Sequence, residues 1–177
     1  MLHRLRARML REGGYSMIEL LTALVILGTI TGAVTTLFLQ ASTAEVDMNR
    51  RFQAQQEARV AVDRMRREVH CAKSISPTGV SAAITVTVAR VCPTAVGNVD
   101  TAHTYDVISA DGRFKLRRNG VVIADHVSEQ NAFSYTAPVT GTSLGKLRVT
   151  LPINTKPSDK SKEWRLVADI VLRNTTR

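Results

Sequence analysis

Residues 11–39 read REGGYSMIELLTALVILGTITGAVTTLFL, and this stretch decides how the chain is organised. Residues 17–39 are apolar apart from one charge, Glu19. At a rise of ~1.5 Å per residue they form a helix of about 35 Å, longer than the ~30 Å hydrocarbon layer of a membrane. The chain after Leu39 is mostly polar. The sequence therefore predicts one membrane helix near the N-terminus, followed by a single globular head.

Glu19 is the unusual residue of this helix. An ionised carboxylate costs ~2.5–3.5 kcal/mol at the centre of a bilayer and less near the interface, and such groups are usually paired and functional. Glu19 lies two residues inside the apolar run. One interpretation is therefore an ordinary signal anchor that tolerates a charge near its end.

A second interpretation comes from the arrangement around Glu19. Gly14, Tyr15, Glu19 and the apolar helix together resemble the class III signal of type IV pilins and of type II secretion pseudopilins. In that family a prepilin peptidase in the membrane cuts after the glycine and methylates the new N-terminal amine. The resemblance implies cleavage between Gly14 and Tyr15, N-methylation at Tyr15, and retention of the helix. Tyr15 departs from the phenylalanine or methionine that is commoner there.

The resemblance also implies a role for Glu19. Helices of such subunits pack side by side in a filament, where a buried carboxylate needs a partner. The N-terminal amine at Tyr15 of a neighbouring subunit is a natural one. Breaking a buried pair costs ~3–5 kcal/mol, and such pairs set register between subunits.

Gly28 and Gly32 form a G-x-x-x-G pair within the apolar run. Small residues at this spacing allow close approach of helices. The resemblance offers an alternative, because a stretch near these positions unwinds in assembled filaments of the family. The sequence has no proline between residues 1 and 76, whereas many pilins carry one slightly further on.

The basic charge is spread along the chain. The formal net charge is +9, and the leader contributes +3 from four arginines and Glu12, so the cleaved chain keeps +6. The leader arginines predict a cytoplasmic N-terminus and a head outside the cytoplasm. The remaining charge indicates either a solvated basic surface or an anionic partner such as DNA or lipid headgroups.

The helical pattern continues beyond the membrane run. Apolar residues recur mostly every three or four positions, at Phe52, Ala58, Ala61, Val62, Met65, Val69 and Ala72. We place the charged residues on the other face, with i,i+4 pairs at Arg59–Asp63, Asp63–Arg67 and Arg64–Glu68. This predicts one continuous helix over residues 16–73, whose second half packs on a sheet or, alternatively, on a partner helix.

The remainder of the chain has the pattern of β-strands. Candidate strands cover residues 84–88, 104–108, 113–118, 121–124, 133–135, 146–151 and 164–172. Asn119-Gly120 predicts a type I′ hairpin, and Asp111-Gly112 a second turn. The expected fold is α+β and pilin-like, with a long helix packed on an antiparallel sheet. The expected parts are a leader (1–14), a transmembrane and filament-core helix (15–39), an amphipathic helix (40–75) and a β-rich head (76–177).

Two longer stretches narrow the resemblance. Residues 58–75, ARVAVDRMRREVHCAKSI, and residues 104–136, TYDVISADGRFKLRRNGVVIADHVSEQNAFSYT, resemble PilW-type minor pilins and J-type minor pseudopilins. The first resembles the end of the long helix in those proteins, and the second resembles their middle section.

Cys71 and Cys92 are the two cysteines. A head outside the cytoplasm lies where disulfides persist. A bridge between them would close a loop of about 20 residues and contribute about 3 kcal/mol in the chain-entropy model. The alternative is a pair of free, buried thiols.

No motif points to catalysis, so we expect no enzyme, cofactor or metal site. His3, His70, His103 and His126 lack the spacing of a metal motif. Asp100, Asp106 and Asp111 could form a calcium cluster, but their spacing is not that of an EF-hand loop, and surface turns explain their positions better.

Three functions remain in view. The first is a structural minor pilin or pseudopilin subunit of a type IV pilus or secretion filament. Its partners would be prepilin peptidase, other pilin or pseudopilin subunits and an inner-membrane assembly platform. It would start as a single-pass inner-membrane protein and then join an extracytoplasmic or surface filament. The second is a pilus-tip module that binds DNA or a surface through its basic head. The third is a membrane-anchored protein that does not assemble.

Overall fold

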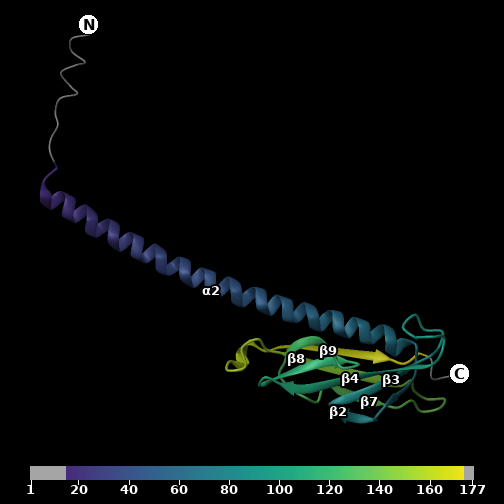
Figure 1. The fold of residues 1–177 in the computed structure, drawn as a ribbon. Coiled ribbons are helices and arrows are strands. Elements are labelled where there is room, and N and C mark those ends of the chain that lie inside the picture. The colour runs from purple at the N-terminus through teal and green to yellow at the C-terminus, as the bar shows by residue number, and fades with distance from the viewer. Residues whose placement is uncertain (1–14, 174–177) are drawn as a thin grey trace, which may run out of the picture. The chain divides into compact units, whose positions relative to one another are not determined.

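A computed structural model describes residues 15–173 of the chain. The first element is the α-helix α2, Met17–His70, and strands β1 to β9 follow it. The chain divides into two compact units, Met1–Asp47 and Met48–Arg177, with the boundary inside α2. The first unit contains the apolar part of the helix, and the second contains the rest of the helix together with the sheet (Figure 1).

In the first unit, α2 satisfies its own polar groups. The carbonyl of Ser16 accepts hydrogen bonds from the N–H groups of Glu19 (2.9 Å) and Leu20 (3.1 Å) and opens the helix. Threonine hydroxyls along the apolar segment donate to carbonyls three or four residues earlier, at Thr22, Thr29, Thr31, Thr35 and Thr36. These hydroxyls need no outside partner, which suits an apolar environment.

The end of α2 differs from the sequence prediction. We expected the helix to reach residue 73 and the amphipathic part to fill residues 40–75, but the helix ends at His70. The Cys71 N–H donates to the Glu68 carbonyl (3.2 Å), and the next residue, Ala72, already belongs to strand β1. The basic residues Arg67 and His70 in the last turn suit the negative end of the helix dipole.

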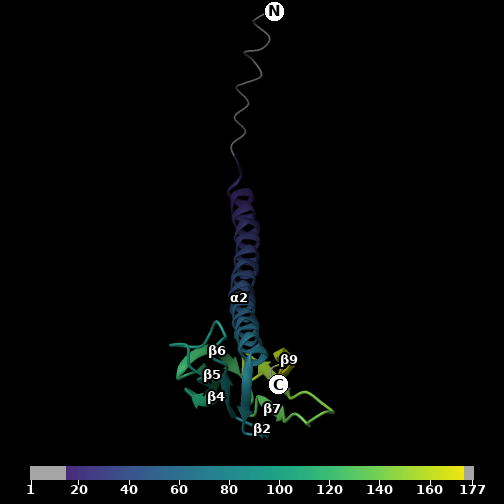
Figure 2. The ribbon, with the colours of Figure 1, turned by 90° about the vertical axis from the view of Figure 1, so that its right-hand side faces the viewer.

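All strand pairings in the second unit are antiparallel. The main path through the sheet runs β1-β3-β4-β5-β6-β8-β7-β2, and β9 pairs with β8. Figures 1 and 2 show this sheet from two directions. A short 3-10 helix, η1 (Lys160–Lys162), precedes β9. The strand bounds are β1 Ala72–Ser76, β2 Gly79–Ser81, β3 Ala83–Val88, β4 Thr101–Ala110, β5 Arg113–Arg118, β6 Val121–Val127, β7 Phe133–Thr136, β8 Lys146–Ile153 and β9 Trp164–Val171.

Two tight turns set the register of three central strands. Asn119 and Gly120 have φ values of 49° and 80°, and Asp111 and Gly112 have 54° and 71°. Positive φ at both central residues is the signature of a type I′ turn, which suits the twist of a hairpin. The predicted type I′ turn at Asn119-Gly120 is confirmed, and it leaves Arg118 opposite Val121.

The core of the second unit lies between α2 and the sheet. The buried face of the helix consists of Ala54, Ala58, Ala61, Val62, Met65, Glu68 and Val69. It packs into one cluster with buried sheet residues such as Val86, Tyr105, Leu116 and Ile170. The α+β prediction is therefore confirmed as one long helix that starts apolar, together with an antiparallel sheet.

The predicted apolar face of the helix was wrong at Phe52, whose side chain is 64% exposed. Ala54 is buried instead. At 100° per residue, Phe52 lies about 200° from Ala54 and therefore on the opposite side of the helix. The strand predicted over residues 164–172 is observed as β9, and its side chains alternate, with Ala168 and Ile170 buried and Trp164 partly buried against the core.

Candidate functional site

The apolar part of α2 is the first feature with functional meaning. Its best 18-residue window has a mean hydropathy of 2.0 and no residue buried within the structure. Every large apolar side chain between residues 17 and 39 is more than half exposed. By length and composition this helix can cross a membrane, which is compatible with a single-pass membrane protein.

Glu19 lies in the first turn of this helix. Its backbone carbonyl accepts a hydrogen bond from the Thr22 hydroxyl (2.9 Å). Its carboxylate makes no hydrogen bond or ion pair with any residue in the described range 15–173. Tyr15 is 80% exposed just before the helix begins, and Gly14 lies outside the described residues. The carboxylate is therefore available to a group on another molecule.

Gly28 and Gly32 lie one helical turn apart and face open space. A Cβ atom added at either glycine would meet no other atom within 4 Å. The helix is continuous through both positions, and the Gly28 carbonyl accepts a hydrogen bond from Thr31 (3.1 Å). The single chain therefore has a regular helix here, and each glycine leaves room for close approach of another helix.

The two cysteines lie at the junction of helix and sheet. Cys71 and Cys92 form a disulfide, with Cα atoms 5.9 Å apart and a sequence separation of 21. The Ala89 N–H also donates to the Cys71 carbonyl (3.1 Å). His70 Nδ1 lies 3.0 Å from the Val171 carbonyl and joins the end of the helix to β9. These contacts fix the end of α2 to the loop after β3 and to strand β9.

A buried charged cluster holds the same end of the helix, and the sequence analysis missed it. We placed Glu68 on the exposed face with Arg64, but Glu68 is fully buried. The Tyr105 hydroxyl donates to its Oε2 (2.6 Å), and the Arg118 guanidinium contacts its Oε1 through Nε (3.0 Å) and Nη2 (2.7 Å). Tyr105 and Arg118 face each other across β4 and β5. Three elements therefore meet at one carboxylate.

The electrostatics of this cluster keep both partners of Glu68, Tyr105 and Arg118, protonated. Burial raises the pKa of Tyr105, and the hydrogen bond and negative charge of Glu68 raise it further. Burial alone would lower the pKa of Arg118, but the hydrogen bond and charge of Glu68 outweigh it and raise that pKa. Tyr105 therefore stays a donor and Arg118 stays a cation across the physiological pH range.

The helical spacing of the apolar residues could have predicted that Glu68 lies on the buried face of α2. It lies three residues after Met65 and seven after Ala61, both of which are buried. These spacings place all three side chains on one face. A carboxylate on an apolar face predicts a buried partner, but the period alone does not identify Arg118, which is 50 residues away in sequence.

The other ion pairs predicted on the helix surface also differ from those in the structure. Asp63 pairs with Arg66 (3.2 Å), three residues later, and both side chains are about half exposed. This geometry replaces the expected pairs of Asp63 with Arg59 and Arg67. The Arg59 guanidinium instead lies 5.5 Å from the ring centre of Trp164, in a cation–π contact between helix and β9.

The three aspartates considered as a calcium cluster are not gathered. Asp100 binds Lys73, Asp106 binds Arg117 and Asp111 binds Lys115. The hydrogen bond from Lys73 holds the pKa of Asp100 below its usual value. Within residues 15–173, no group of three or more histidines, cysteines or acidic residues is placed to hold a metal ion. His3 lies outside that range.

Comparisons with protein-family models, curated proteins and solved structures gave no match for this chain. The geometry and the N-terminal sequence are therefore the basis for the function proposed below.

Proposed function

We propose that this protein is a structural subunit of a type IV pilin-like filament, of the minor pilin or pseudopilin kind. The observation that carries the proposal is the apolar helix of residues 17–39 with its single charge. Its large side chains are all more than half exposed, and its carboxylate has no partner among the described residues. Such a surface is incomplete in a single chain and suits a bundle of identical or related helices.

The membrane is the first environment of this helix. The leader arginines keep the N-terminus in the cytoplasm, and the head lies outside. Prepilin peptidase then cuts after Gly14 and methylates the amine of Tyr15. The Cys71–Cys92 disulfide supports the outer location of the head, because disulfides persist outside the cytoplasm.

Assembly transfers the helix from lipid into a helical bundle. The assembly platform extracts the cleaved subunit, and its helix packs against helices of other pilin or pseudopilin subunits. The Glu19 carboxylate pairs with the amine of a neighbour's Tyr15, which fixes the axial position of one helix against the next. Gly28 and Gly32, one turn apart, let two helices approach closely.

The test separates processing from assembly. In the native host, Glu19→Ala should be cleaved as in the wild type but largely lost from sheared filaments, as measured by immunoblot. Glu45→Ala removes an exposed carboxylate of the same helix and serves as the matched control. Normal incorporation of the Glu19 variant would contradict the pairing role. Absence of the wild-type protein from every filament fraction would contradict the proposal itself.

A further inference from the structure

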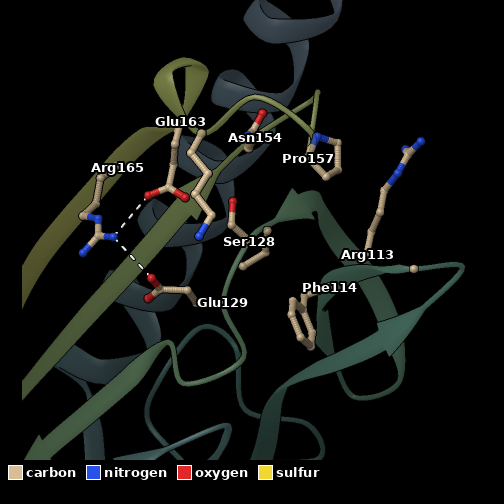
Figure 3. Close-up of a pocket in the computed structure, with 11 residues that line it drawn as sticks. Arg113, Phe114, Ser128, Glu129, Asn154, Pro157, Glu163 and Arg165 are labelled. Atoms are coloured by element: carbon tan, nitrogen blue, oxygen red, sulfur yellow. Dashed lines mark hydrogen bonds and ion pairs between the residues drawn. The ribbon is translucent and has the colours of Figure 1, made fainter.

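A cavity of about 410 Å³ opens on the head, where three chain segments come together (Figure 3). The first segment is the start of β5, the second follows β6, and the third runs from the end of β8 into β9. Its volume lies in the range of sites that bind small molecules. The lining residues that matter below are Arg113, Phe114, Ser128, Pro157, Lys160 and Arg165.

Ser128 provides a polar group without a partner at this cavity. Its Oγ atom is buried and makes no hydrogen bond to any described residue. The Ser128 N–H donates to the Pro152 carbonyl (2.8 Å), so the backbone there is fixed. In Figure 3 the hydroxyl points into the space bounded by Asn154, Pro157 and Phe114. A buried hydroxyl without a partner is unfavourable, and a ligand atom in the cavity would satisfy it.

The charges around the cavity leave two cations without a carboxylate. Arg165 Nη2 contacts both Glu129 (3.3 Å) and Glu163 (3.1 Å), so one guanidinium serves both acids. The Lys160 ammonium makes no hydrogen bond or ion pair with any residue in the described range. The Arg113 guanidinium has only His126 Nδ1 as a side-chain partner there, at 3.3 Å.

Further lining residues are of two kinds: Asn154, whose amide is already hydrogen-bonded within the protein, and the apolar Phe114 and Pro157. The Asn154 amide donates to the Asp159 carbonyl (3.0 Å), and its oxygen accepts from the Lys156 N–H (2.8 Å), so it stabilises the loop. Phe114 and Pro157 present carbon surfaces to the cavity. The site thus combines unpaired positive charge, one free hydroxyl and an apolar wall.

We propose that this cavity binds a small ligand with one anionic group, a carboxylate or a phosphate, on a body of about monosaccharide size. The anionic group takes a charge-assisted contact from Lys160 and a hydrogen bond from the Ser128 hydroxyl. The carbon body lies against Phe114 and Pro157. This inference does not depend on the filament proposal, because every residue of the site belongs to the head.

The test uses the full chain in nonionic detergent micelles. Trp164 is the sole tryptophan and lies between Glu163 and Arg165, so its fluorescence should report binding. The probes are glucuronate, glucose 6-phosphate, and glucose as the neutral body. At least one anionic sugar should bind about tenfold more tightly than glucose, and added salt should weaken it. Binding of glucuronate alone assigns a carboxylate ligand, and binding of glucose 6-phosphate alone assigns a phosphate ligand.

Calorimetric titration of variants locates the binding. Lys160→Gln and Ser128→Ala should each weaken binding by about tenfold or more, which is the effect of losing one charge-assisted contact. Lys156→Gln removes an exposed lysine of the same loop that does not line the cavity, and it should bind like the wild type. No saturable binding of either anion would overturn the proposal. Equal weakening in Lys156→Gln and Lys160→Gln would also overturn it, because the effect would then be general surface charge.

Discussion

The Tyr105 hydroxyl donates a 2.6 Å hydrogen bond to the Glu68 carboxylate in the core of the head. Glu68 lies in the last turns of α2, and Tyr105 lies in the middle of β4. Arg118 balances the buried negative charge from β5. Buried polar groups of this kind stabilise a fold only when all of them are satisfied. The contact therefore ties the stability of the helix end to the sheet.

Removal of Glu68 tests this tie most simply. We expect Glu68→Ala to lower the free energy of unfolding by about 3 kcal/mol, because Tyr105 and Arg118 both lose their partner. The value lies at the low end for buried pairs, since the Arg118 side chain keeps 18% exposure to water. Urea unfolding of the full chain in micelles, followed by Trp164 fluorescence, measures the change.

Asp63→Ala is the control for this prediction. Asp63 belongs to the same helix but makes an exposed pair with Arg66, so its loss should cost less than about 1 kcal/mol. Equal destabilisation by the two variants would show that the buried cluster has no special importance.

The Tyr105 hydroxyl should make stability fall at alkaline pH. Its pKa is raised above the ordinary value of 10.0, first by burial and then by Glu68. The folded chain therefore keeps this proton above pH 10, while the unfolded chain releases it. Since the unfolded state then binds fewer protons, this contribution is complete below pH 10 and declines as pH rises further.

The matching variant is Tyr105→Phe. At neutral pH it should cost about 1–3 kcal/mol, because the Glu68 carboxylate loses the hydrogen bond that it accepts from the Tyr105 hydroxyl. The difference in urea midpoint between wild type and variant should shrink as pH rises above 10. A difference that stays constant across that range would show that Tyr105 ionises alike in both states.

The disulfide should stabilise the head mainly by restricting the unfolded chain. We expect the double variant Cys71→Ser, Cys92→Ser to lose about 3 kcal/mol, as for a loop of about 20 residues. Reductant should destabilise the wild type by a similar amount and leave the double variant unchanged. Alkylation of both thiols in unreduced, unfolded protein would show that the bridge is absent.

Two substitutions at Gly28 and Gly32 distinguish close packing from unwinding. Alanine adds one carbon in open space at each site. It also stabilises the helical conformation by about 1 kcal/mol relative to glycine. If the glycines serve close packing, alanine should be tolerated and Gly28→Leu should block assembly. If they serve unwinding, alanine should already reduce filament incorporation. Ala23→Leu is the matched control for added volume, and incorporation is measured by immunoblot of sheared filaments.

The sequence predicted the elements with regular patterns. The apolar run, the alternation in β3 and β9, and the Asn119-Gly120 turn each have a local cause that appears in a short window of sequence. Strand β1 was missed because its register shifts between Ala72 and Ser74, which breaks the alternation. Strand β2 was missed because it has only three residues, too few for a period to show.

The functional groups were predictable only in part. Glu19 stands out because it is charged within an apolar run. Glu68 was assigned to the surface because charged residues surround it in sequence, and its partners come from distant strands. The cavity around Ser128 is formed by three separate segments, so no local motif reveals it. Contacts between distant residues decide both cases.

The central claim is that this chain is processed and assembled as a pilin-like subunit. Intact mass and N-terminal sequencing of the protein purified from its own membrane test it most directly. We predict a chain that starts at Tyr15 with a methylated amine, and a Gly14→Ala variant that keeps its leader. A wild-type chain that still starts at Met1 would contradict the claim, and the protein would then be an ordinary membrane-anchored head.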